Sequence, residues 1–226
     1  GVSNIKGVLD ELKAQGFAGN ITFSGTTQLT GLNADATPNT ADDVKPLSVA
    51  ANMSATLGGA VGEVTAGSGI SKNGPGTLVL SADNTFTGPM VVNNGTLVVN
   101  GNNLANASVG AGKLQGTGAV RVLSVFDGTA DSVANGGTVS PGSDTAADQL
   151  DASRADLAAG GNYLFNLNDV SGGAGSGWDL LNLTGVGTPN GFVDVTAGAG
   201  GFTLAISGPG TGFDASQSQA FRFVQA

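Results

Sequence analysis

The chain has few residues suited to catalysis, because it contains neither His nor Cys. The usual metal cages and nucleophile–base pairs are therefore missing. Any enzyme would depend on carboxylates, Lys, Arg, Ser or Tyr. Glycoside hydrolysis needs two carboxylates a few ångströms apart. The nearest candidate pairs are Asp42 with Asp43, Asp10 with Glu11, and Asp144 with Asp148. Since adjacent strand residues point to opposite faces, we interpret these acids as solvated charges and predict no catalytic site and no enzyme.

One polar stretch offers a weak metal site. Asp35, Asp42 and Asp43 share a segment with Asn33 and Asn39, and oxygen-rich loops can hold Ca²⁺. The spacing fits no EF-hand, and the nonapeptide Gly-Gly-x-Gly-x-Asp repeat is missing. We interpret the segment chiefly as an ordinary solvated loop and expect no cofactor, with Ca²⁺ as the one candidate.

Several other side chains have structural interpretations. Trp178 and Tyr163 could stack on a sugar, but aromatic residues in apolar strand segments more often belong to a core. Three Asn residues are expected to serve turns or to stack as internal ladders: Asn84, Asn94 and Asn103. Four basic residues look like isolated solubilising charges: Lys72, Lys113, Arg121 and Arg154.

The composition indicates short strands joined by tight turns. Gly accounts for 39 of 226 residues and charged residues for only 11%, while the hydrophobic share of 40% is too high for a disordered chain. The net charge of −9 and the scattered basic residues argue against a nucleic-acid partner, which usually requires a basic stripe. No run of about 18 apolar residues exists, so we predict no membrane-spanning helix.

The spacing of apolar residues predicts a short helix near the N-terminus, followed by strands. Val8, Leu9 and Leu12 have helical spacing within residues 8–15, and Gly16 is placed as a C-cap. Ile21–Phe23 alternates as a strand, and Asn33 to Lys45 is expected to form a surface loop.

The segment Gly76-Thr-Leu-Val-Leu80 recurs as Gly95-Thr-Leu-Val-Val99, with looser echoes at Gly118–Val122 and Gly137–Val139. A period of about 20 residues predicts stacked coils. The apolar side chains of these coils should form one internal column: Leu78, Leu80, Leu97 and Val99.

The predicted organisation has two parts. Residues 1–19 form an N-terminal helical cap or lead-in, and residues 20–226 form the solenoid. The repeat fades within residues 145–226, where alternating segments such as Tyr163–Leu167 and Phe202–Ile206 remain. These segments are either further coils, the interpretation we favour, or a separate C-terminal β subdomain.

The segment Gly74–Gly88, followed by Val91–Val99, closely resembles the autotransporter-associated β-strand repeat. That family's pattern is G-x-G-T-L-x-L-S-G-x-N-T-Y-T-G, then a strand, then G-T-L-x-V; Ala82 and Phe86 replace its Gly and Tyr. Weaker similarity extends to Gly137–Gly142 and Gly177–Leu181. The resemblance implies an all-β chain folded as a right-handed parallel β-helix, secreted or held at a bacterial cell surface.

The leading hypothesis is therefore an extracellular structural or adhesive β-solenoid with a short N-terminal capping helix, acting as a stalk, a passenger segment or a self-associating fibre subunit. Its expected partners are further copies, stacked end to end through unpaired strand edges, and a host-cell or glycan surface. The alternative is a polysaccharide-active or polysaccharide-binding β-helix protein. Such a binding module would depend on Trp178 or Tyr163.

Overall fold

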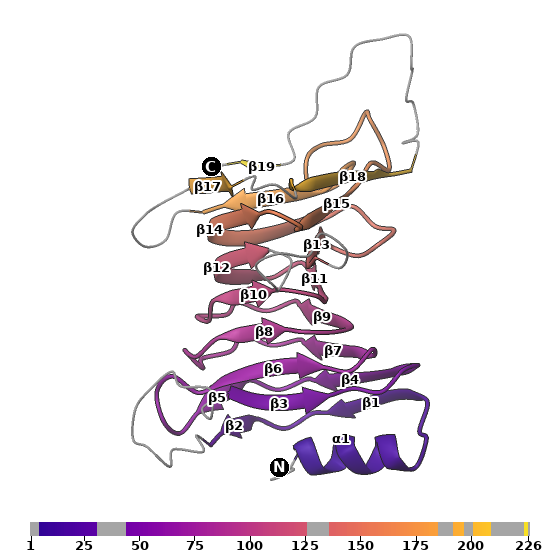
Figure 1. Ribbon diagram of the computed structural model, residues 1–226, viewed down its shortest axis with the longest axis vertical. Helices are drawn as coiled ribbons and strands as arrows, with labels where there is room; N and C mark the ends of the chain where they lie inside the picture. Colours follow the sequence, from indigo (N-terminus) through magenta and orange to yellow (C-terminus); the bar gives the residue numbers. More distant parts are fainter. Residues whose placement is uncertain are drawn as a thin grey trace.

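The computed structural model describes residues 5–30, 44–125, 136–184, 192–196, 201–208 and 224–225. Within these ranges the chain winds into a parallel β-helix with one helix at its N-terminal end (Figure 1). Three sheets run along the stack, and every strand pair in them is parallel. No helix in these ranges is long and apolar enough to cross a membrane.

The first sheet contains eight strands. In spatial order they are β1 (Gly19–Phe23), β4 (Met53–Leu57), β7 (Thr77–Leu80), β9 (Thr96–Val99), β11 (Lys113–Gly116), β13 (Thr138–Pro141), β15 (Asn162–Asn166) and β18 (Thr203–Ser207). This order follows the chain, because each coil contributes one strand and the next coil stacks on it.

The second sheet contains nine strands. They are β3 (Val44–Ser48), β6 (Gly69–Asn73), β8 (Met90–Val92), β10 (Ala107–Val109), β12 (Ala119–Val125), β14 (Gln149–Ala158), β16 (Leu180–Leu183) and β19 (Val224–Gln225) in spatial order, with β17 (Phe192–Thr196) paired to β14. A third sheet joins β2 (Thr27–Leu29) to β5 (Val61–Glu63) near the N-terminal end.

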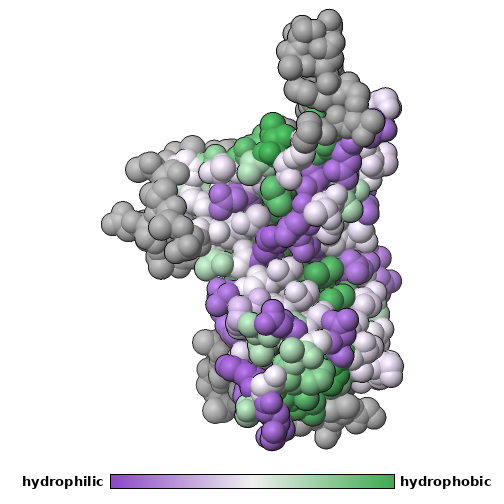
Figure 2. Space-filling model, turned by 90° about the vertical axis from the view of Figure 1, so that its right-hand side faces the viewer, coloured by the Kyte–Doolittle hydropathy of each residue, from purple (hydrophilic) through white to green (hydrophobic). Residues whose placement is uncertain are grey.

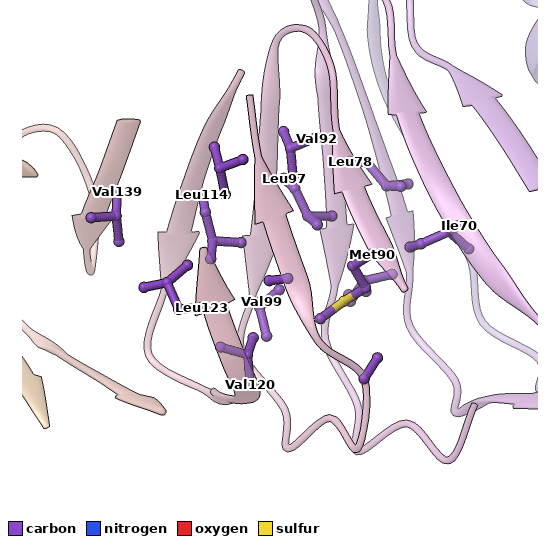
Figure 3. Close-up of a cluster of buried hydrophobic side chains, with 14 of the residues drawn as sticks. Ile70, Leu78, Met90, Val92, Leu97, Val99, Leu114, Val120, Leu123 and Val139 are labelled. Atoms are coloured by element: carbon purple, nitrogen blue, oxygen red, sulfur yellow. The ribbon is translucent and has the colours of Figure 1, made fainter. Parts of the chain in front are cut away.

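The interior consists of side-chain columns set by the strand register. Leu78 lies beside Leu97, and Leu97 beside Leu114, which in turn lies beside Val139. All four side chains are fully buried (Figure 3). Because alternate strand residues face inward, the neighbouring column is formed in the same way by Leu80 and Val99. Each such burial contributes roughly 1.5–3 kcal/mol, so the predicted Leu and Val column is confirmed.

The helix α1 spans Ile5–Ala14 and begins earlier than the sequence pattern predicts. The reason is that Ile5, one helical turn before Leu9, is also buried on the apolar face. Gly16 adopts a φ of +68°, and the backbone N–H of Phe17 donates to the carbonyl of Leu12, which ends the helix in a glycine cap. Figure 1 shows α1 at the N-terminal end of the stack.

Two details of the predicted strand pattern are wrong. Gly118–Val122 does not continue the row of β7 and β9, since it enters β12 in the second sheet. The row continues through β11, because the coil after β9 is shorter and already brings Leu114 beside Leu97. The predicted loop from Asn33 to Lys45 also ends early, because Val44 and Lys45 already pair in β3.

The described strands after residue 145 join the same two sheets. Strand β14 pairs with β12, and β15 pairs with β13, both in parallel. Coil length varies more here, since the step along the chain from Tyr163 to its partner Leu204 is much longer than the step from Val139 to Tyr163. Residues Phe221–Phe223 also alternate apolar and polar side chains, as in a strand, and they lie outside the described residues.

Candidate functional site

The carboxylates that could have formed a catalytic pair are engaged elsewhere. On α1, Asp10 accepts a bond of 2.6 Å from the Lys6 ammonium, and Glu11 accepts one of 2.7 Å from the Gln15 amide. Both contacts join neighbouring turns on the exposed helix surface, where such pairs stabilise the helix by only about 0.2–0.5 kcal/mol. The helix therefore presents these acids to solvent and not to each other.

Asp144 and Asp148 likewise take part in separate contacts. The ammonium of Lys113 and the amide of Gln115 both lie 2.6 Å from Asp144 oxygens, so Lys113 is not an isolated charge. The carboxylate of Asp148 accepts the backbone N–H of Gln149 at 2.8 Å.

The weak Ca²⁺ candidates Asp35, Asp42 and Asp43 lie outside the described residues. In the parts of the chain that the structure does describe, no group of three or more acidic residues could hold a metal ion.

A buried carboxylate in the C-terminal coils gave no signal in the sequence. Asp179 is fully buried just before β16. It accepts the backbone N–H of Asn166 at 2.9 Å, the Asn166 side-chain amide at 3.0 Å and the backbone N–H of Asp148 at 3.2 Å. Burial raises the pKa of Asp179 to about 7, and the nearby Asp148 charge adds to this, while the hydrogen bonds from Asn166 and Asp148 oppose it. The Asp179 carboxylate therefore connects its own segment by hydrogen bonds to two others, the residue before β14 and the end of β15.

The interpretation of Lys72 as a solubilising charge is wrong. Lys72 lies on β6 between Leu47 and Val92 in the register, which is an inward position, and it is fully buried. Its ammonium donates to the carbonyls of Gly74 at 2.7 Å and Asn94 at 2.9 Å, and to that of Asn73 at 3.1 Å.

Lys72 therefore binds two successive turns through backbone oxygens. Desolvation lowers the pKa of Lys72 to about 8. The sequence pattern does not predict that Lys72 is buried. Strand β6 has the sequence Gly-Ile-Ser-Lys-Asn, in which apolar and polar residues do not alternate clearly enough to show which side chains point inward.

The predicted asparagine ladder is present for two of its three members. The Asn84 amide donates to the side-chain oxygen of Asn103 at 2.9 Å, and both residues are buried. Asn94 has an exposed side chain and contributes only its carbonyl, to Lys72.

The remaining candidates also have structural roles. Tyr163 is fully buried and packs edge-to-face on Phe165 with ring centroids 6.3 Å apart, so its assignment to the core is confirmed. Burial also raises the pKa of Tyr163. Trp178 is half-buried against the same core, and Arg154 pairs with Asp156.

The segment that carries the clearest sequence repeat runs from β6 to β9. It contains Lys72 and Asn84, and its two ends stack on each other, since Ile70 pairs with Met90 and Leu78 with Leu97. Residues 70–99 match the family model of the passenger-associated-transport-repeat. The matched residues contain two strands of each long sheet, so they cover one full coil from β6 to β8 together with β8 and β9 of the next coil. No curated protein matches the chain.

The passenger repeat agrees with the resemblance drawn from Gly74–Gly88 and Val91–Val99. It indicates an autotransporter passenger β-helix, of the kind exported or exposed at the bacterial surface. Such repeats are structural, and the contacts of Lys72, Asn84 and Asn103 are structural too, because each one ties neighbouring coils together.

Proposed function

We propose that the chain is an extracellular structural segment, a stalk or passenger that spaces and displays other surfaces at a bacterial cell surface. The observation that carries this proposal is the unbroken register of the first sheet from β1 to β18. The steps between its eight strands, at about 4.8 Å each, make a rod about 34 Å tall. Continuous backbone pairing along the whole rod makes it stiff.

The side-chain chemistry supports a structural role better than the polysaccharide-active alternative. Several of the described acids form ion pairs, accept hydrogen bonds from neighbouring groups, or are buried. Of the two aromatic residues considered for sugar stacking, Tyr163 has no exposed surface. Adhesion would then depend on loops at the flanks of the rod, with a host-cell or glycan surface as partner.

The proposal can be tested by removing one coil. Deleting residues 77–95 joins Gly76 to Thr96, and because Thr77 and Thr96 occupy equivalent register positions, β9 can take the place of β7 beside β4. Asn103 can take the place of Asn84, its neighbour in the ladder. A spacer tolerates this loss of one coil, whereas a site built on that coil does not.

The variant should be displayed on bacteria between a membrane anchor and an N-terminal epitope. We expect it to remain folded by circular dichroism, resistant to protease and accessible to antibody. A matched control deletes residues 77–87, which removes β7 but retains β8 and should abolish folding. Turnover or selective binding in a glycan screen, lost on deletion of 77–95 while the fold persists, would overturn the structural role.

A further inference from the structure

The buried ammonium of Lys72 contacts the peptide carbonyls of two Asn-Gly pairs, Asn73–Gly74 in one coil and Asn94–Gly95 in the next. It lies 3.1 Å from the Asn73 carbonyl oxygen and 2.9 Å from the Asn94 carbonyl oxygen. Both pairs lie in turns that lead from the second sheet to the first, on the right-hand flank of Figure 1. This flank faces the viewer in Figure 2, where it carries hydrophilic patches. Because the pKa of Lys72 is about 8, the group is charged at neutral pH and acts on both peptide units.

An Asn-Gly pair can convert itself by an intramolecular reaction. The glycine nitrogen gives its proton to hydroxide and attacks the Cγ atom of the asparagine side chain. A C–N bond forms there, ammonia leaves, and a succinimide ring results; glycine has no side chain to hinder this closure. Water then adds to one of the two ring carbonyl carbons and breaks the bond of that carbon to nitrogen, which leaves aspartate or isoaspartate. The overall exchange consumes one water and releases one ammonia.

The Lys72 ammonium is placed to assist both steps at Asn94. When the Gly95 nitrogen loses its proton, the negative charge spreads onto the Asn94 carbonyl oxygen, because the peptide unit is conjugated. A charge-assisted hydrogen bond to that oxygen stabilises the anion. After ring closure the same oxygen belongs to a ring carbonyl, and the ammonium polarises that carbonyl toward water. Addition at its carbon gives isoaspartate, in which the oxygen that Lys72 holds becomes part of a free α-carboxylate.

The two Asn-Gly pairs differ in the freedom of the asparagine side chain. The Asn73 amide donates to the Ser71 carbonyl at 3.2 Å and to the Ser71 hydroxyl at 3.1 Å, and the Asn73 side-chain oxygen accepts from Asn93 at 3.1 Å. These bonds restrict the side-chain rotations on which ring closure depends. The Asn94 side chain is exposed and forms no hydrogen bond with the described part of the chain. Asn94 is therefore the more reactive of the two.

A third Asn-Gly pair provides a comparison without the ammonium. Asn100–Gly101 follows β9 directly, and the Asn100 side chain is exposed like that of Asn94. Within the described ranges no lysine donates to the Asn100 carbonyl. Of the three described pairs, Asn94–Gly95 is therefore the one that combines a free side chain with an ammonium on the reacting peptide unit.

We propose that Asn94–Gly95 is a self-modification site, at which Lys72 promotes the conversion of Asn94 to isoaspartate with water as the co-reactant. The inference goes beyond the structural role and does not depend on it. The product places a carboxylate on the buried ammonium, so the contact between neighbouring turns becomes an ion pair, while the backbone of the turn gains one atom. Because ammonia is lost to solvent, the change is irreversible and accumulates with the age of the protein.

The first experiment follows this conversion in the folded full chain, incubated in heavy-oxygen water at neutral pH. Peptide mass spectrometry resolves the three sites, and incorporated heavy oxygen identifies conversion during the incubation. The rate at each site is divided by the rate of the same site in the urea-unfolded chain, which removes the effect of neighbouring sequence. We expect this ratio at Asn94 to exceed those at Asn73 and Asn100 by about tenfold. The isoaspartate share should also be larger at Asn94 than at Asn100.

A second experiment removes the ammonium. Lys72→Met should lower the ratio at Asn94 to that at Asn100. Lys113→Met is the matched control, because the Lys113 ammonium donates to the Asp144 carboxylate, and it should leave the Asn94 rate unchanged. Circular dichroism checks that both variants fold. Should Lys72→Met fail to fold, the comparison of the three sites in the wild-type chain decides the proposal alone.

Two outcomes would overturn the proposal. One is an Asn94 ratio no higher than that of Asn100, and the other is a folded Lys72→Met variant that converts Asn94 as fast as the wild type does. An aspartate product that predominates at Asn94 would overturn the assigned direction of ring opening. None of these results affects the structural proposal, because the coil deletion decides that.

Discussion

The side-chain amide of Asn84 donates to the side-chain oxygen of Asn103 across 2.9 Å, so residues at equivalent positions of two successive coils form consecutive members of one ladder. The ladder extends at both ends into backbone groups. The backbone N–H of Val61 donates to the Asn84 side-chain oxygen at 2.7 Å, and the Asn103 amide donates to the carbonyl of Ala119 at 3.2 Å. The two amides therefore satisfy backbone groups at the first residues of β5 and β12.

Replacing Asn84 by Ala should destabilise the fold by about 1–3 kcal/mol, because the buried N–H of Val61 loses its acceptor. Urea unfolding followed by circular dichroism measures the change. Asn94→Ala is the control, since the Asn94 side chain is exposed and its carbonyl remains available to Lys72. Equal effects of the two substitutions would show that the ladder contributes little.

The buried ammonium of Lys72 predicts a rise in stability with pH. Its folded pKa of about 8 lies below the ordinary value of 10.5, so the unfolded state binds more protons between these values. Stability should therefore increase from pH 8 to pH 10, by on the order of 1–3 kcal/mol. Above about pH 10 the raised pKa of Tyr163 acts in the opposite direction.

Lys72→Met should abolish this increase, because Met has similar length and no charge. Lys13→Met provides the control, since Lys13 is exposed on α1, and it should retain the wild-type pH dependence. The Lys72 mechanism fails if the free energy of unfolding of wild type and Lys72→Met runs parallel between pH 8 and pH 10.

Asp179 predicts the opposite pH dependence in the acidic range. Its folded pKa of about 7 lies above the ordinary value of 3.8, so the folded state binds more protons between these values. The contribution of Asp179 is fully present below pH 4 and is lost as pH rises through 7. The expected loss is on the order of 1–3 kcal/mol.

Comparison of wild type with Asp179→Asn isolates this contribution. The variant retains one oxygen acceptor for the N–H groups of Asn166 and Asp148 and has no titratable group at this position. It should show a smaller loss of stability between pH 4.5 and pH 7. Glu11→Gln, an exposed substitution on α1, should change neither the free energy of unfolding nor its dependence on pH. An unchanged pH slope in Asp179→Asn would assign the slope to other groups.

Close stacking of turns predicts intolerance at Gly76. A Cβ at this position would lie 2.1 Å from the carbonyl oxygen of Ala50 and 2.5 Å from that of Met53. Gly76→Ala should therefore force the turns apart and cost about 1–3 kcal/mol. Gly58→Ala is the matched control, because its nearest neighbour, the Phe23 carbonyl, would lie at an ordinary 3.5 Å. Thermal unfolding of both variants gives the comparison.

The sequence predicts the fold where coils have equal length. The recurrence of Gly76–Leu80 at Gly95–Val99 directly encodes the pairing of Leu78 with Leu97. The same reasoning fails at Gly118–Val122, because the next first-sheet strand begins after a shorter coil and repeats the pattern only as Lys113–Gly116. The length of a turn leaves no periodic pattern in the sequence, so the length of each coil is known only from the structure.

The buried polar residues are the part that the sequence conceals. Lys72 and Asp179 have the residue types of a solvated surface, and only the strand register and the surrounding turns make them internal. Asn84 and Asn103 are easier to predict, because they recur with the repeat. For Leu204 and Ile206 the sequence pattern is correct, because both alternate as inward residues opposite Tyr163 and Phe165. Their strand, β18, is the last described strand of the first sheet.

Stacked strands are separated by a short interval of sequence, and this has a consequence for the folding rate. Examples are the steps from Ile70 to Met90 and from Leu78 to Leu97. Most contacts in the regular coils join positions separated by less than about a tenth of the chain length, a relative contact order typical of helical bundles and not of β-sandwiches. Each closure spans a short loop and has a small entropic cost. We therefore expect this β-protein to fold at the speed of a helical protein, by adding one turn at a time to a preformed edge.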